Sequence, residues 1–399
     1  MERRALTFTY LGHYLHHLFM LLYATVVLAL EREFHRPYGE LLALSLPAFV
    51  LSGVGALPAG WLGDRFGERK MLTVYFLGIG ASAIGAGLAP SPFWIAVALG
   101  VMGLFASIYH PVGFGWLVRH ASRRGRALGI NAVFGSAGTA SAALVAGALI
   151  DLVDWRAAFI VPGAATLVIA LLFLALIPAE APNAARREAG SARPTARAML
   201  GSTRLFAALC VILMGGSVIY NALTVGMPKL FAERLGDGGE LVDVASLVTL
   251  VYAVAAGAQL LGGYLADRAP HRIVLVVAYG ALVPVLLLTT SAMGTPLVVA
   301  AVAILSLVMA VQPAVDSLIA HHAPPEWRST AYGLRFVVSL SSSAASVPLV
   351  GFIFDSTGSF TWVFFTLVGF AALVLVACVL LPSVRAAPAG ARSQPSAAE

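Results

Sequence analysis

Charged side chains are scarce in this chain of 399 residues. Asp, Glu, Lys and Arg together make up 11% of it, whereas hydrophobic residues make up 59%. Soluble globular proteins carry about 25% charged residues, because polar groups must cover their surface in water. This chain has too few polar residues to do so, and we therefore expect lipid rather than water to surround most of it.

Cysteine is also nearly absent, and so are the short motifs of common enzymes. Cys210 and Cys378 both lie in apolar runs, so neither a disulfide framework nor a zinc motif is indicated. The chain holds no G-x-S-x-G, H-E-x-x-H or P-loop sequence. We expect neither an enzyme nor a bound cofactor. The net charge of +6 comes from basic residues in short loops, so we expect no nucleic-acid partner.

Long hydrophobic runs, by contrast, recur along the whole chain. A helix needs about 20 apolar residues to cross a bilayer. The strands of a membrane barrel would instead alternate apolar and polar residues, and these runs do not. The prediction is an all-α membrane protein. Its twelve expected transmembrane helices are at 8–30, 40–62, 71–89, 93–117, 127–150, 157–178, 203–230, 242–265, 273–292, 297–320, 331–354 and 360–381.

Basic residues are distributed unevenly between alternate loops. Short cytoplasmic loops of membrane proteins are enriched in Lys and Arg. If the N-terminus is cytoplasmic, 19 of the 25 basic residues fall in cytoplasmic segments and four lie on the opposite side. We therefore expect both termini in the cytoplasm and the protein in the inner membrane of a bacterium.

The chain is expected to divide into two bundles of six helices each, at 1–178 and 203–382. The polar stretch 179–202 is rich in Ala, Arg and Pro and is expected to be a cytoplasmic linker between them. The small and polar tail at 383–399 is expected to be disordered.

An internal repeat relates the two halves. GWLGDR at 60–65 recurs as GYLADR at 263–268, an offset of 203 residues. Both copies follow the second helix of their half. Asp151 and Asp355 likewise fall near the ends of equivalent helices. Duplicated halves of six helices are a recurring plan among secondary transporters.

The segment GWLGDRFGERK, residues 60–70, resembles the loop signature G-x-L-x-D-R-x-G-R-[KR] of the major facilitator superfamily. Helix count, duplication and loop placement extend the resemblance over essentially the whole chain. It implies two pseudo-symmetric bundles, alternating access, and a latch at this loop that stabilises the outward-facing state. A plain cytoplasmic loop that follows the charge bias is the alternative. The residues that match the latch are Gly60, Asp64, Arg65, Gly67, Arg69 and Lys70, with Asp267 and Arg268 in the second copy.

Three histidines lie within the apolar runs. His13 and His17 are four residues apart and share one face of the first helix, and His110 precedes a proline in the fourth. Ionisable groups are costly in a bilayer and are commonly functional there. Because the first and fourth helices line the central cavity in the superfamily, the resemblance places these histidines on the path of substrate or protons. A transition-metal site, or neutral histidines bonded to nearby backbone or hydroxyl groups, are the alternatives.

Other polar residues in the spans suggest further sites. Asp316 and Arg335 are expected to form a buried ion pair with a structural or gating role, with a proton-carrying Asp316 as the alternative. Lys229 is expected to reach the outer surface, next to a break in the helix at Pro228. The remaining cavity-lining candidates are Tyr220, Asn221, Thr224 and Gln312.

Two short segments resemble one branch of the superfamily. GHYLHHLFMLLYATVVLALEREF at 12–34 and SIYHPVGFGWLVR at 107–119 are similar to the fosmidomycin-resistance branch. This resemblance implies proton-coupled efflux of a drug-like or anionic organic molecule. Uptake or facilitated transport of a metabolite, or transport of a transition metal or metal complex, remains open, and a sensor without transport is the alternative of another class. The expected partners are a small-molecule substrate, protons and the lipid bilayer, and the chain is expected to be a monomer.

Overall fold

The computed structural model describes residues 2–178, 203–235, 241–322 and 328–381. These residues form helices joined by short loops, and no strand occurs in the ranges described. Within them, twelve helical segments are long and apolar enough to cross a membrane, which confirms the predicted architecture. The expected linker at 179–202 and the expected tail at 383–399 lie outside the described residues.

The helices of the first half supply six of these spans. The second span combines α2 with α3, and the fourth combines α5, the π-helical turn η1 and α6. Their bounds are α1 Glu2–Phe34, α2 Tyr38–Ala43, α3 Leu46–Phe66, α4 Glu68–Gly87, α5 Pro92–Ala106, η1 Tyr109–Gly113, α6 Phe114–His120, α7 Arg124–Leu152 and α8 Ala157–Leu176.

The second half repeats this order. Its fourth span combines α13 with α14. The predicted break at Pro228 was wrong, because α10 continues as a helix through that residue. The bounds are α10 Thr203–Arg234, α11 Leu241–Arg268, α12 His271–Thr289, α13 Gly294–Ala310, α14 Gln312–His322, α15 Arg328–Thr357 and α16 Phe360–Val379.

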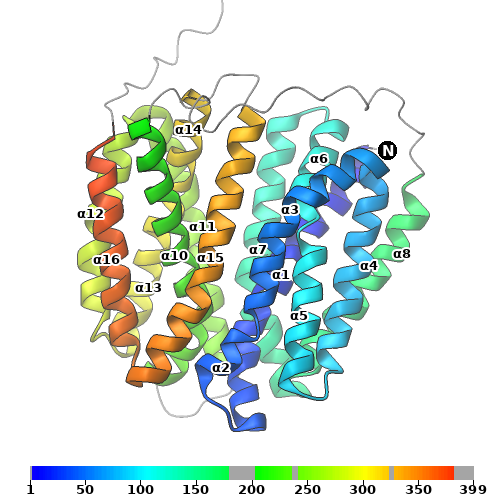
Figure 1. The fold of residues 1–399 in the computed structure, drawn as a ribbon, viewed down its shortest axis with the longest axis horizontal. Helices are drawn as coiled ribbons and strands as arrows, with labels where there is room; N and C mark the ends of the chain where they lie inside the picture. Colours follow the sequence, from blue (N-terminus) through cyan, green and yellow to red (C-terminus); the bar gives the residue numbers. More distant parts are fainter. Residues whose placement is uncertain (1, 179–202, 236–240, 323–327, 382–399) are drawn as a thin grey trace, which may run out of the picture.

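The two halves also pack alike. In the first half α1 contacts α7, α3 contacts α5 and α4 contacts α8, and in the second half α10 contacts α15, α11 contacts α13 and α12 contacts α16. The halves meet along two equivalent pairs, α7 with α11 and α3 with α15. Figure 1 shows the halves as neighbouring bundles with the N-terminus at one end and α2 at the other. We call these the Glu2 end and the α2 end.

Glycines allow backbones of neighbouring helices to touch. A Cβ atom at Gly138 of α7 would overlap the carbonyl oxygen of Tyr14 in α1, and one at Gly103 of α5 would overlap the carbonyl oxygen of Ala48 in α3. Small residues permit such close approach between helices in a membrane. Because α1 and α7 lie this close, side chains on their facing surfaces are near enough to contact one another.

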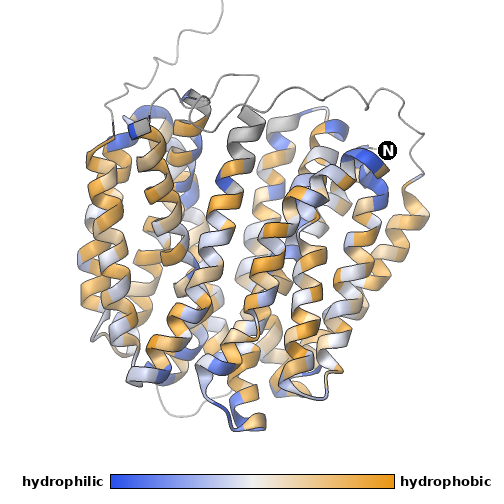
Figure 2. Cartoon of the chain, in the orientation of Figure 1, coloured by the Kyte–Doolittle hydropathy of each residue, from blue (hydrophilic) through white to orange (hydrophobic). Residues whose placement is uncertain are grey.

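Large apolar side chains cover much of the outside of the bundle. Leu57, Leu171 and Leu260 are each more than 60% exposed. Figure 2 shows hydrophobic residues along the length of the helices, with hydrophilic residues more frequent toward the two ends. A continuous band of exposed apolar side chains marks a surface that water does not solvate, as expected for helices surrounded by hydrocarbon.

Candidate functional site

Four histidines meet in the interior of the first half. His13, His16 and His17 come from α1, and His110 comes from η1. The ring of His13 lies 4.9 Å from that of His17 and 5.5 Å from that of His110, between centroids. The ring of His16 lies 4.4 Å from that of His110. The structure thus brings together the three predicted histidines and adds a fourth.

The backbone of η1 positions His110. Pro111 has no N–H group and cannot continue an α-helical hydrogen-bond ladder. At this point the helix widens into the π-helical turn Tyr109–Gly113 between α5 and α6. Such turns occur frequently at functional sites. The turn presents Tyr109 and His110 toward α1, where both rings contact His13.

The orientation of His13 follows from its hydrogen bonds. Its Nδ1 atom lies 2.7 Å from the carbonyl oxygen of Asn131 in α7, and because a carbonyl only accepts, Nδ1 carries the hydrogen. The Nε2 atom of a neutral His13 therefore has its lone pair free to accept. That Nε2 atom lies 3.2 Å from Nε2 of His17. Two ring nitrogens of adjacent turns thus face each other.

Tyr109 and Gly135 hold this arrangement. The Tyr109 ring stacks on His13 at 5.1 Å with an interplanar angle of 18°. Its hydroxyl lies 2.8 Å from the carbonyl oxygen of Thr9 and 2.9 Å from Oδ1 of Asn131. A Cβ atom at Gly135 would lie 2.6 Å from the His13 ring, so only glycine leaves room for that ring.

The predicted residues of the second half lie on α10 and its neighbours. Asn221 is buried, and its side-chain amide donates to the carbonyl oxygen of Ser343 at 2.7 Å and to Oγ of Ser346 at 2.6 Å. Thr224 Oγ1 lies 2.5 Å from the Tyr252 hydroxyl. Tyr220 is partly buried against the apolar core. Asn221 and Thr224 therefore join α10 to α15 and α11.

Asp316, Arg335 and Gln312 form one group between α14 and α15. Arg335 Nε lies 2.8 Å from Asp316 Oδ1, and its Nη2 donates to Gln312 Oε1 at 2.9 Å. The Arg335 side chain is 13% exposed and that of Asp316 is 38% exposed. The predicted pair therefore spans two helices of the same half, and Gln312 joins it.

The residues of the predicted latch lie at the Glu2 end. Gly67 ends α3 with φ 95°, a backbone conformation that suits glycine at a tight turn. Asp64 is exposed and has no hydrogen bond or ion pair among the described residues. Arg69 donates through Nε to the carbonyl oxygen of Ile177 at 2.7 Å, within its own half.

Arg65 of this loop and Arg268 of its second copy contact aromatic rings of their own helices among the described residues. The guanidinium of Arg65 lies 5.3 Å from the Trp61 ring, and that of Arg268 lies 3.8 Å from the Tyr264 ring. Lys70 and Asp267 are exposed. Among the described residues, no hydrogen bond, ion pair or cation–π contact joins Asp64, Arg65, Arg69, Lys70, Asp267 or Arg268 to the other half.

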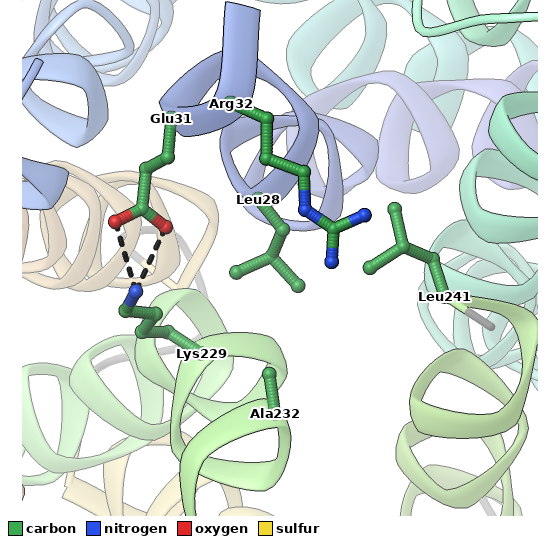
Figure 3. Close-up of a pocket in the computed structure, with 6 residues that line it drawn as sticks. All are labelled: Leu28, Glu31, Arg32, Lys229, Ala232 and Leu241. Atoms are coloured by element: carbon green, nitrogen blue, oxygen red, sulfur yellow. Dashed lines mark hydrogen bonds and ion pairs between the residues drawn. The ribbon is translucent and has the colours of Figure 1, made fainter. Parts of the chain in front are cut away.

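An ion pair joins the halves at the α2 end. Lys229 Nζ of α10 lies 2.8 and 2.9 Å from the two carboxylate oxygens of Glu31 in α1, as Figure 3 shows. The prediction that Lys229 extends to the surface was wrong, because its side chain is only 17% exposed and points to Glu31. A charge that is largely desolvated needs an opposite charge nearby. Glu31 was not singled out from the sequence, since it lies at the polar end of its apolar run.

Two aspartates in equivalent positions also join the halves at this end. Asp151 at the end of α7 accepts a hydrogen bond from the backbone N–H of Val242 in the first turn of α11, at 2.7 Å. Asp355 near the end of α15 accepts one from the backbone N–H of Gly39 in α2, at 2.9 Å. Each carboxylate thus caps a helix of the other half, where the helix dipole favours an anion.

The sequence matches a known family of membrane transporters along its length. A family model described as the Major Facilitator Superfamily matches residues 9–347 and 243–398. A gallate transporter from Pseudomonas putida is 26% identical over 377 residues, which cover 84% of this chain and 82% of that protein. A tetracenomycin C resistance and export protein from Streptomyces glaucescens is 30% identical over 152 residues, which cover 37% of this chain and 28% of that longer protein.

Solved structures of similar fold are also transporters. A bacterial homologue of the human lysosomal transporter Spinster, in an inward-facing and occupied conformation, superposes with a TM-score of 0.79 at 16% identity over 95% of each chain. A D-xylose–proton symporter superposes with a TM-score of 0.76 at 13% identity, over 95% of this chain and 97% of that one. At these identities the likeness concerns the fold.

Proposed function

Because the chain belongs to the major facilitator superfamily and is an integral membrane transporter rather than an enzyme, we propose that it is a proton-coupled exporter of a small drug-like or anionic organic molecule. It works by alternating access, with the solute bound between the two six-helix bundles. Uptake or facilitated transport of a metabolite is the second candidate, which the likeness to a gallate transporter favours.

The observation that carries this function is the one-sided connection between the halves. Glu31–Lys229, Asp151–Val242 and Asp355–Gly39 all join the halves at the α2 end. The matched loops at the Glu2 end contact residues of their own half among the described residues. Two bundles held together at one end are what alternating access requires, because each state must close one side of the solute path.

The distribution of basic residues indicates which end of the bundle faces the cytoplasm. The Glu2 end carries the loops that hold most of the Lys and Arg side chains, so it is proposed to face the cytoplasm. The conformation described is then closed toward the outside. In the opposite state, the loop with Asp64 and Arg65 is proposed to latch the halves together at the cytoplasmic side.

Polar residues of the interior are proposed to line the solute and proton path. The histidines of α1 and η1 lie within the first bundle, and Tyr220 lies on α10, the equivalent of α1. Asp316 with Arg335 forms an ionisable pair in the second bundle. Ionisable groups at such depth are retained where they serve ion or substrate movement.

Transport by the purified protein in liposomes tests this function. With the Glu2 end outward and an acidic lumen, gallate or tetracenomycin C added outside should accumulate in the lumen above its outside concentration. A protonophore should abolish the accumulation, because it removes the proton gradient. Protein-free liposomes treated identically are the control.

Three results would contradict parts of this function. Absence of any flux above the control for a panel of organic solutes would reject transport of this class. Downhill flux that a protonophore leaves unchanged would reject proton coupling and support facilitated transport. Accumulation only when the gradient is reversed would reject export in favour of uptake.

A further inference from the structure

We propose that His13, His17 and His110 form a binding site for one divalent transition-metal ion, with a coordination position left open. The inference concerns binding and stands apart from the identity of the transported solute. Each histidine offers one ring nitrogen, and these nitrogens lie within 4.8 Å of one another.

The distance between two of the nitrogens already suits a metal. Zn²⁺ binds imidazole nitrogen at about 2.0–2.1 Å with tetrahedral geometry, which separates two such ligands by about 3.3 Å. Nε2 of His13 and Nε2 of His17 are 3.2 Å apart. These two nitrogens therefore already have the separation that two ligands of one ion need, and a ring nitrogen of His110 lies within 4.8 Å of both.

The surroundings of His13 resemble the outer shell of a metal site. A histidine that binds a metal nearly always donates its second ring N–H to a carbonyl or carboxylate, which fixes the ring and its tautomer. His13 donates through Nδ1 to the Asn131 carbonyl, so the lone pair of its Nε2 faces His17 and His110. Tyr109 stacks on the ring, and Gly135 leaves space for it. The site is thus oriented before any ion arrives.

The donor set selects the class of ion. Imidazole suits Zn²⁺, Co²⁺, Ni²⁺ and Cu²⁺, whereas Ca²⁺ and Mg²⁺ prefer oxygen ligands. The group of three contains no carboxylate. Three neutral ligands leave the charge of the ion uncompensated in an apolar interior, so the open position would favour water-derived or organic anions.

The competing explanation is that His13 and His17 are uncharged histidines joined by a hydrogen bond. In that arrangement His17 donates its Nε2–H to His13 Nε2, and no ion is involved. This hydrogen bond accounts for two of the imidazoles. It does not explain why four imidazole rings from α1 and η1 gather in an apolar bundle, three of them with ring nitrogens within 4.8 Å of one another.

Metal titration of the purified full-length chain tests the site. The protein carries a purification tag without histidine, and Zn²⁺ or Co²⁺ is titrated by calorimetry in a buffer that does not chelate. One ion per chain is expected, and ligand-field absorption of bound Co²⁺ should report the imidazole ligands. His17→Gln should weaken binding at least about tenfold, because it removes a ligand and even the loss of an outer-shell partner typically costs 10–100-fold in affinity. His120→Gln is the control and should leave affinity unchanged, because His120 lies in α6 outside the group.

Thermal unfolding keeps the test decisive if a variant folds poorly. An ion that binds the folded chain alone raises the melting temperature in proportion to the logarithm of its concentration. Wild type should show this rise with Zn²⁺ but not with Mg²⁺. Absence of the rise, or Zn²⁺ binding that persists in the triple variant His13→Gln, His17→Gln, His110→Gln, would overturn the site and leave a neutral hydrogen-bonded cluster.

Discussion

At the scale of single residues, Lys229 shows what controls a charge in this apolar molecule. Its ammonium group lies between Glu31 and Glu233, at 2.8 and 3.8 Å, and near the rings of Tyr38 and Phe354, at 5.5 and 5.6 Å. The ion pair with Glu31 crosses between the halves, whereas Glu233 lies on the same helix. Opening the α2 end must therefore separate Lys229 from Glu31.

Glu31→Gln should make the α2 end open more often. Loss of the carboxylate removes an attraction to Lys229 that is partly shielded from water. Such an attraction is worth more than the 0.2–1 kcal/mol of an exposed ion pair. If it contributes about 1.4 kcal/mol to the closed state, its loss raises the population of the open state about tenfold. Leu28 lines the pocket beside this pair and is 6% exposed. A cysteine placed at Leu28, in a chain whose two native cysteines are replaced, should react about tenfold faster with an impermeant thiol reagent.

The matched control is Glu40→Gln. Glu40 pairs with Arg36 at the same end of the bundle, but both side chains are about half exposed and belong to the same half. The labelling rate at position 28 should then stay within about twofold, since exposed pairs contribute little. Equal rates for Glu31→Gln and Glu40→Gln would show that the pair with Lys229 does not hold this end closed.

At the scale of helices, adjacent glycines of α11 differ in what they do. A Cβ atom at Gly262 would overlap the backbone of Ala310 in α13, whereas nothing lies within 4 Å of one at Gly263. In the first half, Gly60 of α3 lies at the repeat position of Gly263, and a Cβ there would lie 3.4 Å from Pro111. The repeated motif therefore contains glycines of unequal packing importance.

Gly262→Ala should destabilise the protein and Gly263→Ala should not. Overpacking at a close helix contact costs about 1–3 kcal/mol, whereas alanine in an open helix position stabilises by up to about 1 kcal/mol relative to glycine. Thermal unfolding in detergent measures both variants. A melting temperature that falls equally for the two would contradict the contact between α11 and α13.

The sequence predicted helices better than their interruptions. Hydrophobic length placed all twelve spans, because a bilayer demands that length of any helix that crosses it. It did not predict that α10 continues through Pro228 or that the fourth span contains a π-helical turn at Pro111. The effect of a proline depends on whether neighbouring helices satisfy the freed carbonyl groups, which is a property of packing.

At the scale of the whole molecule, Asp151 and Asp355 connect the bundles in equivalent ways. Each caps a helix of the other half at the α2 end. The internal repeat noted in the sequence thus reappears as two related contacts between the halves. Both must break when the α2 end opens.

The double variant Asp151→Ala, Asp355→Ala should shift the molecule away from the closed α2 end. Each anion at a helix start contributes about 0.3–1 kcal/mol, so the two together contribute about 0.6–2 kcal/mol, which changes an equilibrium about 3–30-fold. Spin labels at Val153 and Met293, which are exposed positions in different halves, should report a longer-distance population by pulsed electron resonance.

Asp243→Ala is the control for this change. Asp243 lies in the first turn of α11 beside Val242, is exposed, and has no hydrogen bond or ion pair among the described residues. Its loss weakens the helix start without touching the contact between the halves. A distance distribution that moves as much for Asp243→Ala as for the double variant would assign the effect to the helix rather than to the cap.

Four features could be predicted from the amino-acid sequence alone: the lipid surroundings of the protein, its twelve membrane helices, its internal duplication and its family. These follow from composition, run length and a repeated motif, which are local properties that need no knowledge of contacts. The sequence also indicated His13, His17 and His110, because an imidazole in an apolar run is conspicuous. Three features became visible only in the folded molecule: His16 joins these histidines, Lys229 pairs with Glu31, and the halves are joined at the α2 end. Those outcomes depend on how surfaces far apart in the chain approach each other, since the energy of a buried charge or ring nitrogen is set by the neighbours that packing supplies.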